Sequence, residues 1–171
     1  LLDMRGNLKA VAEEDKKRNW SSEGLAKFGD ILRSQNDNME KLGDAVLSTL
    51  VEYVGANQGG LYLIKEEQGS EPHLYLQSAF AWDKKKYLEQ QIHKGEGLTG
   101  QAWQEGEPIY LKEIPEDYIS ITSGLGDASP NAILIMPLIV NEEIHGVLEL
   151  ATFGEFPEYV QEFIAKVAES L

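Results

Sequence analysis

Cysteine is absent from this sequence of 171 residues. Its absence excludes disulfide bonds, thiolate metal ligands, cysteine nucleophiles and chromophores attached through a thioether. Long apolar runs are missing as well. None approaches the roughly 20 residues of a transmembrane helix, and no secretory signal opens the sequence. We therefore expect a cytoplasmic domain. Because the sequence starts at Leu1 and stops at Leu171 inside helical patterns, we also expect a longer parent protein, with or without a membrane anchor elsewhere.

Basic residues are few. The chain has 15 lysines and arginines against 29 aspartates and glutamates, which gives a formal net charge of −14. Such a chain repels phosphate backbones and anionic lipid surfaces, so we expect no nucleic-acid partner. The remaining composition, with 42% hydrophobic and 26% charged residues, is ordinary for a globular protein. The length suits one domain with an appendage.

The appendage is the stretch 1–33, which has the pattern of one long helix. In a seven-residue frame, Asp15 and Arg18 stand in the middle of a seam that is apolar at both ends. An apolar seam needs a partner. We therefore interpret this helix as a signalling connector that pairs with a second copy in a parallel dimer; the alternative is a solvated helix. The expected dimer contacts on the N- and C-terminal helices are Leu8, Val11, Leu25, Leu32, Phe163 and Val167.

Residues 34–171 alternate between helical and strand patterns. The expected helices are 36–54, closed by Gly55, and 155–171; the expected strands outside the central hairpin are 60–66, 73–82, 90–93 and 108–111. Along the second strand, one face should hold Leu74, Leu76, Ser78, Phe80 and Trp82. This order predicts an α+β fold in which the terminal helices cover one face of a mostly antiparallel sheet and a looped pocket lies on the other.

The central hairpin is predicted from two apolar runs, Ile133–Val140 and Ile144–Leu150, with the polar turn 141–143 between them. Strict alternation in the second run would place His145 and Glu149 on one face. A carboxylate at Glu149 must be hydrogen-bonded, line a pocket or face solvent, because burying it unpaired is too costly.

A glycine-rich stretch precedes one of the expected short helices. Gly95, Gly97 and Gly100 match GxGxxG, but a dinucleotide site requires parallel βαβ units, and the neighbours here are antiparallel hairpins. We therefore favour a glycine-permitted turn into a short helix, 98–104, whose apolar side chains face the sheet.

The connection 112–131 is long and mixes hydroxyl and apolar groups, which is typical of a loop that covers a pocket; the alternative is an inert surface loop.

The stretches KGEGLTGQAWQEGEPIYL (94–111) and MPLIVNEEIHGVLEL (136–150) together resemble the GAF domain, a sensory fold of signalling kinases, cyclases, phosphodiesterases and phytochromes. The resemblance covers about 25–171, and the helix 1–33 resembles the signalling helices that join such domains to HAMP-type linkers. It implies a profilin-like antiparallel sheet of six strands. It also implies a dimer through the terminal helices and a pocket on the opposite face.

The ligands of that family can be compared with these residues. Bilin attachment in the family commonly uses cysteine, and so do its free methionine sulfoxide reductases; this chain has none. The NKxnFxxxDE pattern of cyclic-nucleotide-binding members is absent. Haem would need a histidine. His73 is expected to be solvated at a hairpin turn and His93 ends a strand, which leaves His145 as the candidate. We expect no covalent cofactor and no haem.

The sequence does not support a catalytic function either. His145 and Glu149 would lie about 13 Å apart along one strand, beyond hydrogen-bond reach. The sequence has no Ser–His–acid arrangement, no H-E-x-x-H and no Walker motif. We predict that the chain is not an enzyme.

The leading hypothesis is therefore a GAF-type sensory domain of a signal-transduction protein such as a sensor histidine kinase. A small molecule or partner would bias the dimeric terminal helices and control an output domain after Leu171. The alternatives are a ligand-free dimerisation spacer, whose pocket its own side chains fill, and an enzyme of unrecognised type. The expected pocket residues are Phe80, Trp103, Tyr110, Tyr118, Ile121, Ser123, Leu125 and Glu149.

Overall fold

The computed structural model describes residues 2–34, 38–80, 91–114, 121–123, 126–128 and 130–170. Its helices are α1 (Leu2–Ser34), α2 (Met39–Val54), α4 (Gly97–Glu105) and α5 (Glu158–Ser170). Its strands are β1 (Gln58–Lys65), β2 (His73–Phe80), β3 (Ile109–Leu111), β4 (Ile121–Ser123), β5 (Gly126–Ala128), β6 (Ala132–Val140) and β7 (Glu143–Thr152). The content is α+β, as predicted.

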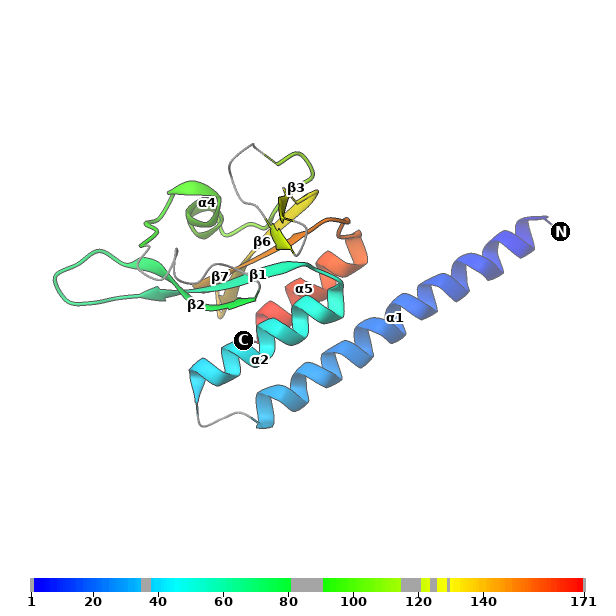
Figure 1. Ribbon diagram of the computed structural model, residues 1–171. Helices are drawn as coiled ribbons and strands as arrows, with labels where there is room; N and C mark the ends of the chain where they lie inside the picture. The colour runs from blue at the N-terminus through cyan, green and yellow to red at the C-terminus, as the bar shows by residue number, and fades with distance from the viewer. Residues whose placement is uncertain are drawn as a thin grey trace.

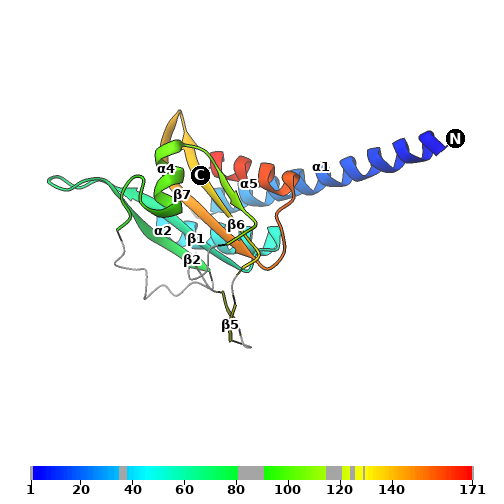
Figure 2. The ribbon, with the colours of Figure 1, turned by 90° about the horizontal axis from the view of Figure 1, so that it is seen from above.

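The main sheet has the order β2-β1-β7-β6-β3, and each neighbouring pair is antiparallel. Within the described residues it has five strands, so the prediction of six is wrong. The expected strand at 90–93 contributes an isolated bridge between Leu74 and Ile92 instead. The long connection 112–131 includes the strands β4 and β5, which pair in a small separate sheet that projects away from the domain (Figure 2).

The sheet separates two layers. Helices α1, α2 and α5 lie on one face, and α4 lies on the other (Figure 1). The cluster on the α1–α2–α5 face, which we call the helix face, includes Phe28, Leu47, Leu50, Leu148, Leu150, Phe163 and Ile164. The cluster on the α4 face includes Tyr62, Leu74, Leu76, Ile92, Trp103, Ile133, Ile135 and Val147. Both faces of β6 are covered, which explains why nearly every residue in it is apolar.

The β6–β7 hairpin confirms the central prediction. Val140 pairs with Glu143, so the turn has two residues, Asn141 and Glu142, with φ of 52° and 66°. Positive φ at both positions defines a type I′ turn, whose twist matches that of the strands. Gly146 is required further along β7, because a Cβ there would lie 2.3 Å from the carbonyl oxygen of Tyr62.

A β-bulge interrupts the alternation in β7. Leu138 pairs with Gly146, but the next residue of β6 pairs with Ile144, so His145 is the extra residue. Beyond the bulge, Ile144 packs in the α4-face cluster, and His145 lines a pocket on the helix face. The prediction that His145 shares a face with Glu149 is therefore wrong.

A second bulge lies in β2. Leu61 pairs with Ser78 and Tyr62 with Leu76, which leaves Gln77 as the extra residue. Leu76 consequently faces α4, whereas Phe80 packs on the helix face. The prediction of a single face along this strand is wrong, and its last member, Trp82, lies outside the described residues.

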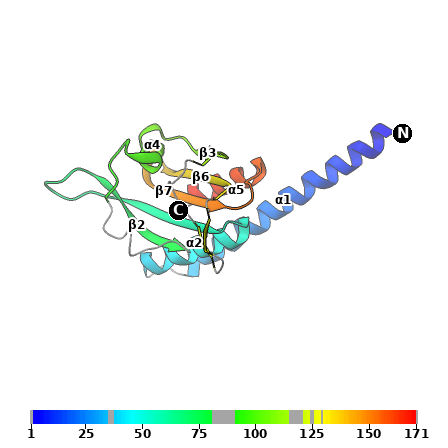
Figure 3. The ribbon, with the colours of Figure 1, turned by 45° about the horizontal axis from the view of Figure 1, so that its top comes forward.

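Helix α1 has two halves. Its C-terminal half packs on α2 and α5, with Phe28 buried and Trp20 in ring contact with Tyr53, Tyr159 and Phe163. Its N-terminal half extends beyond the domain (Figures 1 and 3). Among the described residues, no helix is both long enough and apolar enough to cross a membrane.

Candidate functional site

The α4 face of the sheet carries a buried polar pair on adjacent strands. A Cβ built on Gly59 would lie 2.8 Å from Val51 of α2, so Gly59 faces the helices. Its neighbours Gln58 and Gly60 therefore face α4. Gly60 pairs directly with Glu149. Gln58 and Glu149 are thus diagonal neighbours on one face, with roughly 7–8 Å between their Cα atoms.

Both side chains of this pair are withdrawn from solvent, with exposed fractions of 3% for Gln58 and 2% for Glu149. Within the described part of the chain, Gln58 Oε1 has no hydrogen-bond partner. A buried acceptor without a donor costs about 1–3 kcal/mol. The pair therefore places an acceptor without a donor close to a carboxylate, which suits a group that carries N–H donors.

Ser78 offers a useful contrast on the other side of the sheet. Its Oγ is buried and, among the residues described, also lacks a partner. A Cβ built on Gly43 of α2 would lie 2.9 Å from that oxygen, so Ser78 faces α2. It therefore lies against α2, on the opposite face of the sheet from Gln58.

The residues predicted to form one pocket do not lie together. Trp103 of α4 is buried in the α4-face cluster, on the same face as Glu149. Phe80 and Tyr110 pack on the helix face, and the Tyr110 hydroxyl accepts a hydrogen bond from the Phe156 backbone N–H at 2.9 Å. Both must be removed from the predicted pocket, because Phe80 lies beyond a bulge and Tyr110 packs against Phe156.

The remaining predicted pocket residues belong to the long connection. Tyr118 and Leu125 lie outside the described residues. Ile121 and Ser123 are in β4, but their side chains are among those not described.

An open cleft of about 550 Å³ lies on the α4 side, at the end of the β1–β2 hairpin. It is lined by Ile64, Glu66, Glu71, Pro72, His93, Lys94, Trp103 and Ile144. Trp103 contributes from α4 and Ile144 from β7, so the floor is apolar and the rim is charged.

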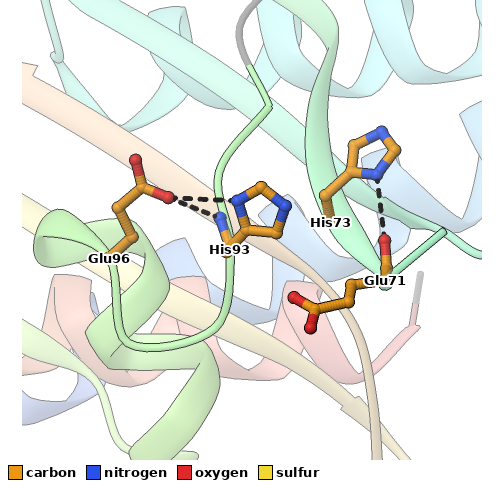
Figure 4. A network of polar contacts seen from close by, with 4 residues as sticks. All are labelled: Glu71, His73, His93 and Glu96. Carbon is orange, nitrogen blue, oxygen red and sulfur yellow. Dashed lines mark hydrogen bonds and ion pairs between the residues drawn. The ribbon is translucent and has the colours of Figure 1, made fainter.

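His93 begins the turn that leads into α4 at the edge of this cleft (Figure 4). The Glu96 carboxylate accepts the His93 backbone N–H at 3.0 Å and contacts the ring Nδ1 at 3.3 Å. These hydrogen bonds, the backbone one first, lower the pKa of the Glu96 carboxyl. In the same turn Gly95 has a φ of 86°, and a Cβ on Gly100 would lie 2.5 Å from the His93 carbonyl oxygen. The GxGxxG stretch thus forms a tight turn into α4, as predicted, and among the described strands no parallel pair accompanies it.

Two of the three histidines considered as haem ligands lie in surroundings that differ from the sequence prediction. His73 is buried, with an exposed fraction of 6%, so the expectation that it is solvated is wrong. His145 lines an apolar pocket of about 90 Å³ beside Leu42 and Leu138 on the helix face, away from Glu149.

The predicted dimer residues divide into three groups. Phe163 and Val167 are fully buried in the chain's own core, which corrects their assignment to a dimer surface. Leu25 and Leu32 are partly buried against the same core. Leu8 and Val11, with exposed fractions of 68% and 52%, lie on the projecting half of α1.

Comparison with known proteins decides the family. A sequence profile of the GAF domain matches residues 36–171, which include α2, the whole sheet and α5. The chain belongs to the GAF family. The matched region begins just after α1; the boundary at 33/34 stays a prediction. None of the curated proteins matches the sequence.

Solved structures share this GAF fold. The GAF domain of an Acinetobacter phosphoenolpyruvate-protein phosphotransferase is 17% identical, with a TM-score of 0.67 over 86% of this chain and 89% of that one. The A. aeolicus nlh2 GAF domain, in an inactive state, is 19% identical, with a TM-score of 0.66 over 90% and 93%. The free methionine-R-sulfoxide reductase of Neisseria meningitidis, in complex with its substrate, is 20% identical, with a TM-score of 0.63 over 86% and 83%.

At such identities the likeness shows the fold alone, and GAF folds support both sensory domains and enzymes. Family membership supports a sensory or regulatory domain. The expectation that this chain is not an enzyme stays a prediction.

Glu149 was among the predicted pocket residues, whereas Gln58 was not. The sequence did contain a signal for Gln58, which stands directly before Gly59-Gly60 at the start of a buried strand. Burying its amide costs free energy unless the amide is hydrogen-bonded.

Proposed function

We propose that this GAF domain is a sensor that binds a small molecule with N–H donors on the α4 face of its sheet. The observation that carries the proposal is the buried Gln58, whose Oε1 has no donor among the described residues and whose diagonal neighbour is the buried Glu149.

The chemistry of this pair favours a cationic or amide-like group. A ligand N–H supplies the donor that Gln58 Oε1 lacks, and the Glu149 carboxylate favours positive charge nearby. A ligand without donors would leave Gln58 unsatisfied, so the site discriminates against purely apolar molecules.

The second part of the proposal concerns the relay of binding. Helices α2 and α5 pack directly on the back of the same sheet, and α1 packs on both. A ligand that alters the sheet would shift these helices by as much as its differential affinity for two arrangements permits. We propose that α1 pairs with a second copy through Leu8 and Val11, and that the domain regulates an output domain of a cytoplasmic or membrane-anchored signalling protein of the histidine kinase type.

A second candidate function is a ligand-free relay domain. The burial of Trp103, with an exposed fraction of 8%, favours it, because that side chain fills part of the α4 face itself. Such a domain would hold the same helices without gaining stability from any metabolite.

Two measurements separate the candidates. Native against denatured mass spectrometry of the purified protein detects a co-purified molecule, and thermal shift against a panel of amines, amino acids and amides detects stabilisation. If the domain is a sensor, its melting temperature should rise by several degrees with at least one compound that carries N–H donors. Gln58→Leu should abolish that gain, because the acceptor is removed.

Ser78→Ala is the matched control, since it removes a buried orphan oxygen on the opposite face. It should leave the ligand response unchanged. Absence of any response, with no co-purified mass, would favour the relay domain and overturn the ligand proposal.

A further inference from the structure

The helix face of the sheet holds a second pocket, which lies between the sheet and the helices α1 and α2. Its volume is about 90 Å³. Leu32 lines it from the end of α1, Val46 lines it from α2, and leucines of β1 and β6 complete its apolar walls. Val46 and Leu138 are buried, whereas His145 at its edge is exposed. The pocket is therefore closed toward the sheet and opens where His145 lies.

Two side chains bring hydrogen-bonding groups to the described lining, Gln77 and His145. Each is the extra residue of a β-bulge, one in β2 and one in β7. Strand β1 lies between these two strands, so bulges on both sides of β1 direct a polar side chain to the same pocket. Bulges re-aim side chains and are frequent beside binding and catalytic sites, which indicates that this pocket takes a ligand.

The polar groups at the pocket favour a neutral hydroxyl. An amide donates and accepts hydrogen bonds, as does a neutral imidazole, and a hydroxyl complements both. Among the described lining residues none is a carboxylate, a lysine or an arginine. A ligand with a fixed charge would therefore lose its hydration without gaining an ion pair.

The volume limits the size of the apolar part. An apolar cavity of about 150 Å³ accommodates the six carbon atoms of benzene, so 90 Å³ suits about four carbon atoms. We propose that this pocket binds a short branched aliphatic alcohol. Its hydrocarbon part lies among the leucines and its hydroxyl lies at Gln77 and His145.

This site is separate from the Gln58–Glu149 pair, which lies on the opposite face of the sheet. Its occupant would contact α1, α2 and the sheet together, because all three contribute to the lining. Binding would therefore favour the arrangement in which the end of α1 packs on the sheet.

NMR of the full chain with ¹³C-labelled leucine and valine methyl groups, titrated with isobutanol, tests the site. The methyl signals of Leu32, Val46 and Leu138 should shift and saturate, with a Kd of about 1 mM because the ligand is so small. The signals of Leu74 and Val147 on the α4 face should stay unchanged. The matched probe is 1,2-propanediol, which also has five non-hydrogen atoms; it should bind about tenfold more weakly, because its second hydroxyl would be buried without a partner.

Val46→Ile should weaken isobutanol binding by about fivefold or more, because the added methyl group occupies part of the pocket. Its melting temperature should equal or exceed that of the parent, since the change fills empty space. Val54→Ile is the control: it makes the same change on the same helix, outside the described lining, and should bind like the parent. His145→Ala, at an exposed position, should weaken binding by about threefold through loss of a hydrogen bond.

Shifts spread equally over both faces of the sheet would overturn the proposal. Equal affinity for the diol, or unchanged affinity in Val46→Ile, would do the same. Gln58→Leu should leave isobutanol binding intact, so the two sites succeed or fail separately.

Discussion

At the scale of single residues, the β6–β7 turn places Glu142 at a φ of 66°, a region that residues with a Cβ avoid. Glycine is the preferred residue there in a type I′ turn after asparagine. Glu142→Gly should therefore raise the free energy of unfolding by about 1 kcal/mol, which is roughly 2–4 °C in melting temperature. Thermal unfolding checks it.

Asn141→Gly is the comparison, because asparagine already tolerates positive φ and should gain less. A loss of stability in Glu142→Gly would show that the Glu142 side chain has a role in the turn that exceeds its backbone cost.

Tyr53 is a second residue whose effect is testable. Its hydroxyl donates a hydrogen bond to the Trp20 carbonyl oxygen and so joins α2 to α1. Burial, followed by the charge of Glu23, raises the pKa of the Tyr53 hydroxyl above its ordinary value. Tyr53→Phe should cost about 1 kcal/mol near neutral pH.

The pH dependence of Tyr53 has a defined sign. Because the pKa of Tyr53 is raised on folding, its contribution is complete below the unfolded value of about 10 and is lost as the pH rises through the folded value. Urea unfolding of parent and Tyr53→Phe from pH 7 to 11.5 should show a constant difference up to about pH 10 that then shrinks. A difference that stays constant throughout would contradict the assignment.

At the scale of elements, α1 crosses its neighbours closely at one glycine. A Cβ on Gly24 would lie 2.6 Å from both Phe163 and Tyr53. Gly29, five residues later on the same helix, has only the Arg33 side chain nearby, at 3.7 Å. Gly24→Ala should destabilise by about 1–3 kcal/mol through overpacking, whereas Gly29→Ala should stabilise by up to about 1 kcal/mol through helix propensity.

Denaturant unfolding of the two alanine variants compares them on one helix. Equal stabilisation in both would mean that α1 does not pack on α5 as described. Both substitutions change the intrinsic helix propensity alike. The difference in unfolding free energy between the two variants therefore measures how closely α1 packs on its neighbours at Gly24.

The two β-bulges also belong to the scale of elements. Each adds one residue to one strand, and each reverses which side chains face α4 from that point on. As a result, His145 and Phe80 lie on the helix face, and Ile144 lines the cleft on the α4 side.

At the scale of the whole molecule, the projecting half of α1 exposes Leu8 and Val11. If these residues pair two copies, the double variant Leu8→Asp, Val11→Asp should be monomeric under conditions where the parent is dimeric, because four buried carboxylates would meet at the seam. Light scattering coupled to size exclusion gives the mass.

Lys16→Asp is the control for the dimer variant. It makes the same net-charge change of about −2 on the same helix but lies outside the apolar seam, so it should remain dimeric. Leu25→Asp is less informative, because Leu25 packs against the domain core and its loss would also unfold the chain. A parent protein that is monomeric at all concentrations would refute the dimer.

The sequence by itself determined the local elements and the family. Apolar periodicity predicted α1, α2, α5 and the β6–β7 hairpin, and the stretches 94–111 and 136–150 led to the GAF fold. These signals are readable because they depend on neighbours within a few residues.

The tertiary structure alone decided which side chains share a face and meet. A bulge arises from the pairing of two distant segments, so alternation within one strand could not show that His145 and Phe80 leave the α4 face. Phe163 and Val167 have the pattern of any apolar helix stripe; only packing shows that their partners lie in the chain's own core and not in a second copy. The Gln58–Glu149 pair and the pocket at Gln77 and His145 likewise depend on register, because each is made of residues far apart in sequence that antiparallel pairing brings together.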